Sequence, residues 1–135
     1  MSQLETLRSM LAPLFPGLMG VTLVEVSKDK VLATMEVRPD LCTTGESLHG
    51  GAFMAFADAL GGVATFVNLP PNARTTTVES STKFLRGAPV GSTVHAECTP
   101  FHKGRTTMVW QTLIRNPEGK LCAVVTQTQL VMPGG

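Results

Sequence analysis

The chain has 135 residues, of which 43% are hydrophobic and 16% are charged, and its formal net charge at pH 7 is +1. This length predicts one domain, residues 1–135, with enough chain for a substantial core. A balanced charge without a basic run excludes a bulk electrostatic attraction to nucleic acid. The charged fraction lies below the roughly 25% of typical soluble domains, which favours a surface partly covered in a homo-oligomer.

The cysteines and the first residues indicate where the protein works. Cys42, Cys98 and Cys122 are odd in number and lack CxxC spacing, so we expect reduced thiols rather than disulfides or a zinc site. His, Cys, Asp and Glu nowhere show metal-ligand spacing, and we expect no metal. The first residues lack the basic-then-apolar pattern of a signal peptide, which predicts a cytoplasmic protein.

The first half of the chain predicts a helix and two strands. Residues 2–11 favour a short amphipathic helix, which Pro13 and Pro16 end. Two strands follow, joined by a turn at residues 28–30; they span residues 21–26 and 31–38. The second strand alternates cleanly and places four apolar side chains on one face: Val31, Ala33, Met35 and Val37. Residues 39–48 form a polar loop.

The segment between Leu48 and Leu69 has only two ionisable side chains, His49 and Asp58. It is too long for a strand and apolar on every face, so we expect a buried helix, and its aspartate and glycines argue against a membrane span. Burying a carboxylate without a partner costs several kcal/mol. Asp58 is therefore either a catalytic group or an acid paired with the backbone or a cation.

After this helix, which residues 70–72 close, the sequence predicts only strands and turns. The expected strands span residues 75–85, 93–100, 107–115 and 120–132, and residues 102–105 form a tight hairpin connection. Short turns require antiparallel pairing. One buried helix needs a sheet that curls around it. The sequence therefore predicts an α+β protein in which an antiparallel sheet wraps one long central helix.

This order of elements, with His49-Gly50-Gly51 opening the helix and Asp58 nine residues after the histidine, resembles the hotdog-fold acyl-CoA thioesterases. The phenylacetate-pathway and 4-hydroxybenzoyl-CoA thioesterase group is the most similar part of the family. Residues 84–87, 102–105 and 109–111 also resemble it, and the likeness extends from about residue 18 to residue 132. It implies a hotdog fold, an acyl-CoA substrate, no cofactor, no membrane, and an active site between two subunits of a dimer or a dimer of dimers.

The helix start and Asp58 are the candidate catalytic elements. The first N–H groups of a helix lack internal partners and favour negative charge, and a glycine lets a carbonyl approach closely. Gly50 and Gly51 thus offer an oxyanion hole, a part that the resemblance gives to the N–H of Gly50; alternatively, both glycines only permit tight packing. Asp58 resembles the catalytic carboxylate, as nucleophile or general base. His49 either contacts the thioester region or fixes the loop through a backbone hydrogen bond.

The resemblance adds further candidates around the substrate. Thr43 stands six residues before the histidine, where many relatives carry an Asn or Gln that holds substrate or water. Thr77 matches a position at which relatives supply a hydroxyl from the partner chain; alternatively, it is an ordinary strand threonine. Arg86, Lys103 and Arg105 lie in expected turns that contact coenzyme A phosphates in relatives, although charged turn residues are commonly just solvated.

The leading hypothesis is therefore an acyl-CoA thioesterase that releases the free acid and coenzyme A. One alternative is a non-catalytic acyl-CoA binding module, against which Asp58 argues. A hotdog hydratase or dehydratase fits the spacing of His49 and Asp58 poorly. Apolar residues of the helix, Phe53, Met54 and Phe56, suit an aromatic or medium-chain acyl group, but would equally form an ordinary core.

Overall fold

The computed structural model describes residues 1–134, which form three α-helices and eight strands. The helices are α1 (Gln3–Leu11), α2 (Phe15–Met19) and α3 (Gly50–Phe66). The long strands are β1 (Thr22–Val26), β2 (Val31–Glu36), β5 (Arg74–Phe84), β6 (Thr93–Lys103), β7 (Thr107–Arg115) and β8 (Leu121–Met132). Two short strands, β3 (Cys42–Thr43) and β4 (Ser47–Leu48), pair with each other just before α3.

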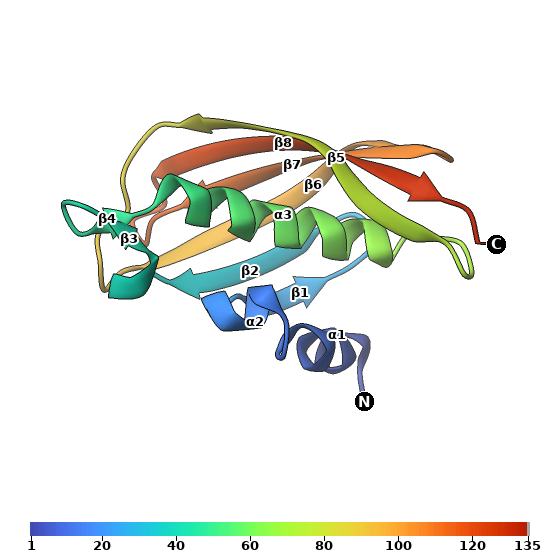
Figure 1. Ribbon diagram of the computed structural model, residues 1–135, viewed down its shortest axis with the longest axis horizontal. Coiled ribbons are helices and arrows are strands. Elements are labelled where there is room, and N and C mark those ends of the chain that lie inside the picture. Colours follow the sequence, from blue (N-terminus) through green and yellow to red (C-terminus); the bar gives the residue numbers. More distant parts are fainter. Residues whose placement is uncertain (135) are drawn as a thin grey trace.

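The long strands form one antiparallel sheet in the order β1-β2-β6-β7-β8-β5. The sheet curls, and α3 lies across its inner face, while α1 and α2 lie beside β1 (Figure 1). The predicted α+β arrangement of a curled antiparallel sheet around one long helix is confirmed. Of the described helices, none has the length and apolar character that crossing a bilayer demands.

The core lies between α3 and the sheet, where the predicted alternation is confirmed. Val31, Ala33, Met35 and Val37 are all buried, and Phe56 of α3 is fully buried. A polar contact ties the helix to the sheet inside this core. Trp110 Nε1 of β7 donates to Thr65 Oγ1 at 2.8 Å, and the Thr65 hydroxyl donates to the Gly61 carbonyl at 2.8 Å. The second half of α3 is therefore fixed against β7.

Two predicted boundaries are wrong. Pro16 does not end the first helix: α1 already ends at Leu11, and Pro16 sits in the first turn of α2, where a missing N–H and a fixed φ are tolerated. Gly20 then ends α2 at a φ of 83°. Strand β6 runs on to Lys103, so His102 and Lys103 are strand residues rather than hairpin-turn residues. A β-bulge between Pro100 and His102 gives the extra residue that lets pairing with β7 continue.

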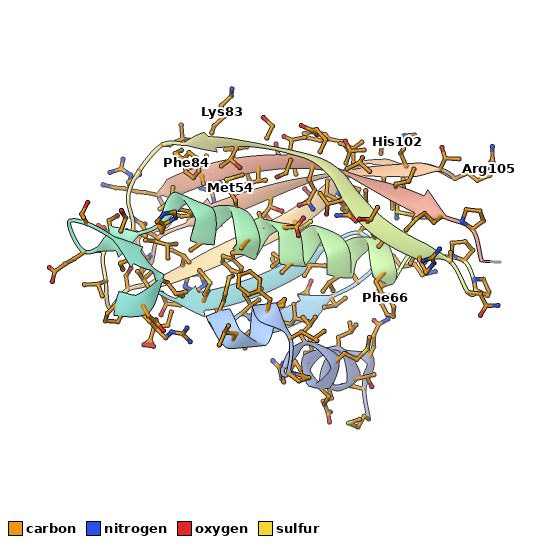
Figure 2. All side chains as sticks on the ribbon, in the orientation of Figure 1. Met54, Phe66, Lys83, Phe84, His102 and Arg105 are labelled. Carbon is orange, nitrogen blue, oxygen red and sulfur yellow. The ribbon has the colours of Figure 1, made fainter. Side chains whose placement is uncertain are left out.

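The helix α3 is also less buried than its sequence predicts. One side of it, which we call the open face, carries four exposed residues: Gly51, Met54, Asp58 and Phe66. Met54 lies near the start of the helix and Phe66 at its end (Figure 2), with 37% and 48% of their surfaces exposed. The sheet covers the other side of α3, and the short helices α1 and α2 do not reach over this one. The edge strand β5 borders the open face.

Candidate active site

The start of α3 leaves one backbone donor available. His49 is the N-cap, and its Nδ1 accepts a hydrogen bond from the Gly51 N–H at 2.8 Å. The His49 carbonyl accepts the N–H groups of Ala52 and Phe53, and its own N–H donates to the Leu41 carbonyl. Among the described residues, no group accepts the N–H of Gly50. The positive end of the helix dipole therefore presents a single N–H to an external oxygen.

Two roles are expected for His49: contact with the thioester region, or a hydrogen bond to the backbone. The structure contains the hydrogen bond to the backbone. Its imidazole caps the helix and occupies the Gly51 N–H, so that N–H has no capacity left for a substrate oxygen. The Gly50 backbone lies under the half-exposed ring of Phe84: a Cβ added at Gly50 would stand 3.3 Å from Phe84 Cζ. Phe84 in turn packs edge-on against Phe53, with ring centroids 6.1 Å apart. An aromatic wall thus borders the free N–H.

Asp58 lies two turns further along α3, and the expectation that it is buried is wrong. The residue is exposed because it lies on the open face of α3, beside β5. It also has two donors: the Thr77 hydroxyl reaches Oδ1 at 2.6 Å and Gln127 Nε2 reaches the same oxygen at 3.3 Å. Its carboxylate is therefore hydrogen-bonded at one oxygen and open to solvent, a suitable state for a group that must meet a substrate.

Thr77 reaches Asp58 within its own chain. Its hydroxyl donates to Asp58 Oδ1, so the two residues occupy one position together, whichever subunit completes the site. The reason is the position of β5 beside α3: Thr77 lies on the inner face of that strand, directly opposite Gln129 of β8. Gln129 Nε2 donates to Thr77 Oγ1 at 2.6 Å, which ties this threonine to the sheet.

The remaining predicted residues lie apart from Asp58. Thr43 is exposed in the β3–β4 hairpin that leads into α3. Arg86 follows β5 at the end of the sheet that holds Phe84, whereas Arg105 lies at the opposite end (Figure 2). The structure does not bring Arg86 and Arg105 of one chain together.

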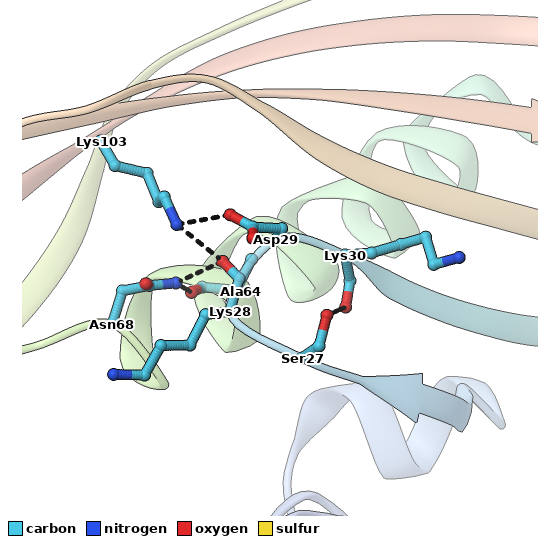
Figure 3. A network of polar contacts seen from close by, with 7 residues as sticks. All are labelled: Ser27, Lys28, Asp29, Lys30, Ala64, Asn68 and Lys103. Carbon is cyan, nitrogen blue, oxygen red and sulfur yellow. Dashed lines mark hydrogen bonds and ion pairs between the residues drawn. The ribbon is translucent and has the colours of Figure 1, made fainter.

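Lys103 is engaged within the fold. Its ammonium contacts Asp29 Oδ1 at 2.5 Å and donates to the Lys28 carbonyl at 3.3 Å (Figure 3). Asn68, just past α3, donates to the same Lys28 carbonyl at 2.9 Å and to the Ala64 carbonyl at 2.8 Å. This group joins the β1–β2 turn to the end of β6 and the end of α3, so the Lys103 charge is already paired.

Two apolar hollows flank the open face of α3. One of about 290 Å³ has Asp58 in its wall, with Leu7, Met10 and Phe66. Another of about 360 Å³ lies beside His49 and Gly51, with Phe15, Leu18 and Leu41 in its wall. Both could hold an apolar group next to the helix. Within residues 1–134, no three His, Cys, Asp or Glu side chains are arranged to hold a metal ion.

Sequence reasoning missed three residues around this network: Gln127, which bonds Asp58; Gln129, which bonds Thr77; and Gly61, one turn after Asp58. One signal was available: the last strand alternates, and both glutamines fall on the face of its buried residues Val125 and Val131. Two polar side chains at core positions of one strand indicate a buried polar network. What they contact could not be read from the strand alone.

Comparison with known proteins agrees with this arrangement. The thioesterase superfamily profile matches residues 45–123, more than half of the chain. A putative esterase of Deinococcus radiodurans is 30% identical over 118 residues, 87% of this chain and 73% of that protein. The 1,4-dihydroxy-2-naphthoyl-CoA hydrolase of Escherichia coli is 28% identical over 129 residues, 96% of this chain and 94% of that protein. A thioesterase structure from Haemophilus influenzae superposes with a TM-score of 0.91 at 30% identity, covering 98% of this chain and 92% of that one.

A curled sheet around a helix that carries an N-terminal donor and an aspartate, together with these likenesses, defines a hotdog-fold thioester hydrolase. The chain belongs to the thioesterase superfamily.

Proposed function

We propose that this protein hydrolyses an acyl-CoA to the free acid and coenzyme A, with Gly50 and Asp58 as its catalytic elements. The observation that carries the proposal is the pairing of a free helix-start N–H with a solvent-open carboxylate on one face of α3. The Gly50 N–H stabilises the oxyanion that forms when the thioester carbonyl is attacked. Asp58 either attacks the carbonyl carbon or takes a proton from the attacking water. Water adds to the acyl carbon, and the thiolate of coenzyme A leaves and is protonated.

The two elements of one chain serve different sites. Gly50 and Asp58 are eight residues apart on α3, which corresponds to about 12 Å along the helix axis. An oxyanion donor must lie about 3 Å from the carbonyl oxygen, and the base or nucleophile must reach the same carbonyl. A single thioester therefore cannot meet both groups of one chain. An antiparallel pairing of two copies of α3 brings Gly50 of one subunit to Asp58 of the partner subunit.

The edge of the sheet supports such a pairing. β5 is an eleven-residue edge strand, and a long exposed edge presents unpaired backbone groups that favour pairing with another chain. When two copies pair their β5 strands about a two-fold axis, their α3 helices run antiparallel and cover each other's open face. The dimer is the smallest assembly that completes the site, and a dimer of dimers preserves the same geometry. Light scattering that finds a monomer near 14.3 kDa at micromolar concentration would overturn this proposal.

The proposed binding site for coenzyme A is formed by turns at the two ends of the sheet. In the antiparallel dimer, Arg105 of the partner subunit approaches the end that holds Gly50 and Arg86. Both guanidinium groups are exposed, so they suit the phosphates of a bound nucleotide. Lys103 would join them only by giving up Asp29. The apolar hollows beside α3 support an aromatic or medium-chain acyl group. A coenzyme A thioester substrate supports a cytoplasmic location.

The test of the activity is thiol release from a panel of aryl and alkyl acyl-CoAs, followed with a thiol reagent. Turnover of at least one member is expected. Tight binding without turnover across the panel would instead support an acyl-CoA binding module.

Complementation tests whether the site is composite. Asp58→Asn removes the carboxylate, and Gly50→Pro removes the free N–H at a helix position that tolerates proline. Each variant alone is expected to be inactive. In a random mixture half of the dimers are mixed, and each mixed dimer rebuilds one of its two sites, so about a quarter of wild-type activity returns. Mixed dimers purified by two different tags that stay inactive would contradict a site shared in this way.

A further inference from the structure

Gln127 is a fully buried glutamine on the inner face of β8, next to Asp58. Its Nε2 lies 3.3 Å from Asp58 Oδ1, and the side chain has no exposed surface. The same face of the strand also carries the buried Gln129, and its other buried residues are apolar, such as Val125 and Val131. The amide is therefore a polar exception at a core position, directed at the proposed catalytic carboxylate.

The helix is shaped to admit this amide. Gly61 lies one turn after Asp58, and a Cβ added there would stand 2.2 Å from Gln127 Cδ, 2.3 Å from Nε2 and 2.5 Å from Oε1. Any residue other than glycine would displace the end of the glutamine. A mid-helix glycine costs roughly 1 kcal/mol relative to alanine. Glycine at position 61 therefore weakens α3 at the point where the Gln127 side chain packs against this helix.

A second chain of hydrogen bonds fixes Thr77. The Thr75 hydroxyl lies 2.9 Å from two acceptors, Gln129 Oε1 and the Leu130 carbonyl, and Gln129 Nε2 donates to Thr77 Oγ1 at 2.6 Å. Because Thr77 Oγ1 accepts from Gln129, its single proton is left for Asp58 Oδ1, 2.6 Å away. The orientation of the threonine hydroxyl is thus set from inside the sheet.

Both donors end on the same oxygen. Oδ1 of Asp58 receives Thr77 and Gln127, whereas none of the described residues donates to Oδ2. We propose that Gln127 is a positioning residue which, with Thr77, holds Oδ1 of Asp58 and leaves Oδ2 as the oxygen that faces the thioester or its attacking water. This inference rests on the proposed catalytic role of Asp58 and adds which of its oxygens reacts.

Packing alone does not explain the glutamine. Its Oε1 has no hydrogen-bond partner among the described residues, and burying an unpaired polar atom lowers stability. A methionine has nearly the same length and would fill the space without that loss. The hydrogen bond from the amide nitrogen of Gln127 to Asp58 Oδ1 explains why an amide is present at this position.

The substitution Gln127→Met tests this assignment. It keeps the volume and removes the donor, so the unfolding midpoint should stay the same or rise. We expect kcat to fall about tenfold, the lower end of the range for a hydrogen bond to a charged group, with KM little changed. The matched control is Val125→Ala on the same face of β8, which leaves a cavity and lowers the unfolding midpoint while kcat is retained. A purely structural role of Gln127 predicts the reverse pattern: a lower midpoint and an unchanged kcat.

Gly61 provides a second, independent approach. Gly61→Ala displaces the amide from the helix side and should lower kcat as much as Gln127→Ala does. In the double variant Gly61→Ala/Gln127→Ala no amide remains to displace, so kcat should fall no further than in either single variant. Losses that multiply would mean that the glycine and the glutamine act separately, and would overturn the inference.

Asp58→Asn, measured in the same assay, separates the two proposals. If Asp58→Asn is inactive and Gln127→Met keeps kcat within about twofold of wild type, the positioning role fails and the catalytic role of Asp58 stands. If Asp58→Asn retains full activity, the catalytic assignment itself fails, whatever Gln127→Met does.

Discussion

Replacing Gly50 by proline removes one atom group from the proposed site, the N–H that faces the oxyanion. The position suits the change, because proline is favoured in the first turn of a helix. His49, which precedes it, already has the extended conformation that proline requires of its neighbour, with φ −62° and ψ 139°. The helix and its cap should therefore persist, and an unchanged circular dichroism spectrum checks this.

The expected loss follows from the hydrogen bonds around the helix start. The N–H groups of His49, Gly51 and Ala52 already have partners, so none of them replaces that of Gly50. Loss of one oxyanion donor typically lowers kcat by about 100- to 1,000-fold, or about 2.7–4 kcal/mol. We expect Gly50→Pro to fall in this range.

Gly50→Ala is the matched control, because it keeps the N–H. It adds the same Cβ near the half-exposed ring of Phe84, which has room to shift. We expect its kcat to stay within about threefold of wild type. The assay is coenzyme A release followed with a thiol reagent. Cys98 and Cys122 are buried, so of the three protein thiols only the half-buried Cys42 adds to the background. Equal kcat values for the proline and alanine variants would refute the oxyanion role of Gly50.

The other predictions concern the carboxylate, the phosphates and a buried thiol. Asp58→Asn should lose activity by roughly 100- to 10,000-fold. Since Asp58 is exposed, the unfolding midpoint of the Asp58→Asn variant should change little. Near-normal turnover by this variant would contradict the catalytic role of Asp58. Neutralising Arg86 or Arg105 should raise KM for acyl-CoA and leave kcat alone, without effect on an acyl-N-acetylcysteamine; equal losses on both substrates would exclude a phosphate contact. Burial raises the pKa of the Cys98 thiol from 9.0 to about 11. Above pH 9 the unfolded chain therefore ionises this thiol first, and the free energy of unfolding should fall by about 2 kcal/mol as the pH rises to 11, as urea unfolding of wild type and Cys98→Ala measures. An identical pH dependence in both proteins would contradict this.

The sequence predicts the sheet and the central helix because both follow from local patterns. Alternation in residues such as Val31 and Ala33 marks the inner face of a strand, and the apolar run after His49 marks the helix. Pro16 shows the limit of such patterns, since a residue expected to end the first helix lies instead in the first turn of the second. Its role depends on the chain that follows, down to the left-handed conformation of Gly20.

The surroundings of Asp58 were beyond sequence reasoning. An apolar helix predicts burial, but which side the sheet covers is a tertiary property, and the aspartate lies on the uncovered side. Gln127 is 69 residues away along the chain and meets Asp58 only because β8 passes under α3. From the sequence alone, Gly61 only predicts a less stable helix. The structure adds the reason for it, because the Gln127 side chain occupies the space that a Cβ would need.

The first twenty residues of the chain contribute a wall to both hollows beside α3: Leu7 and Met10 to one, Phe15 and Leu18 to the other. The proposed oxyanion donor and carboxylate both lie on α3, which forms the other wall of each hollow. In the proposed enzyme, part of the fit to the acyl group would thus belong to a stretch of the gene that carries no reacting group. Mutations in the N-terminal segment would then change which acyl chains are accepted while the reacting groups keep their places. A protein organised in this way can acquire new substrates in small steps, each starting from a working enzyme.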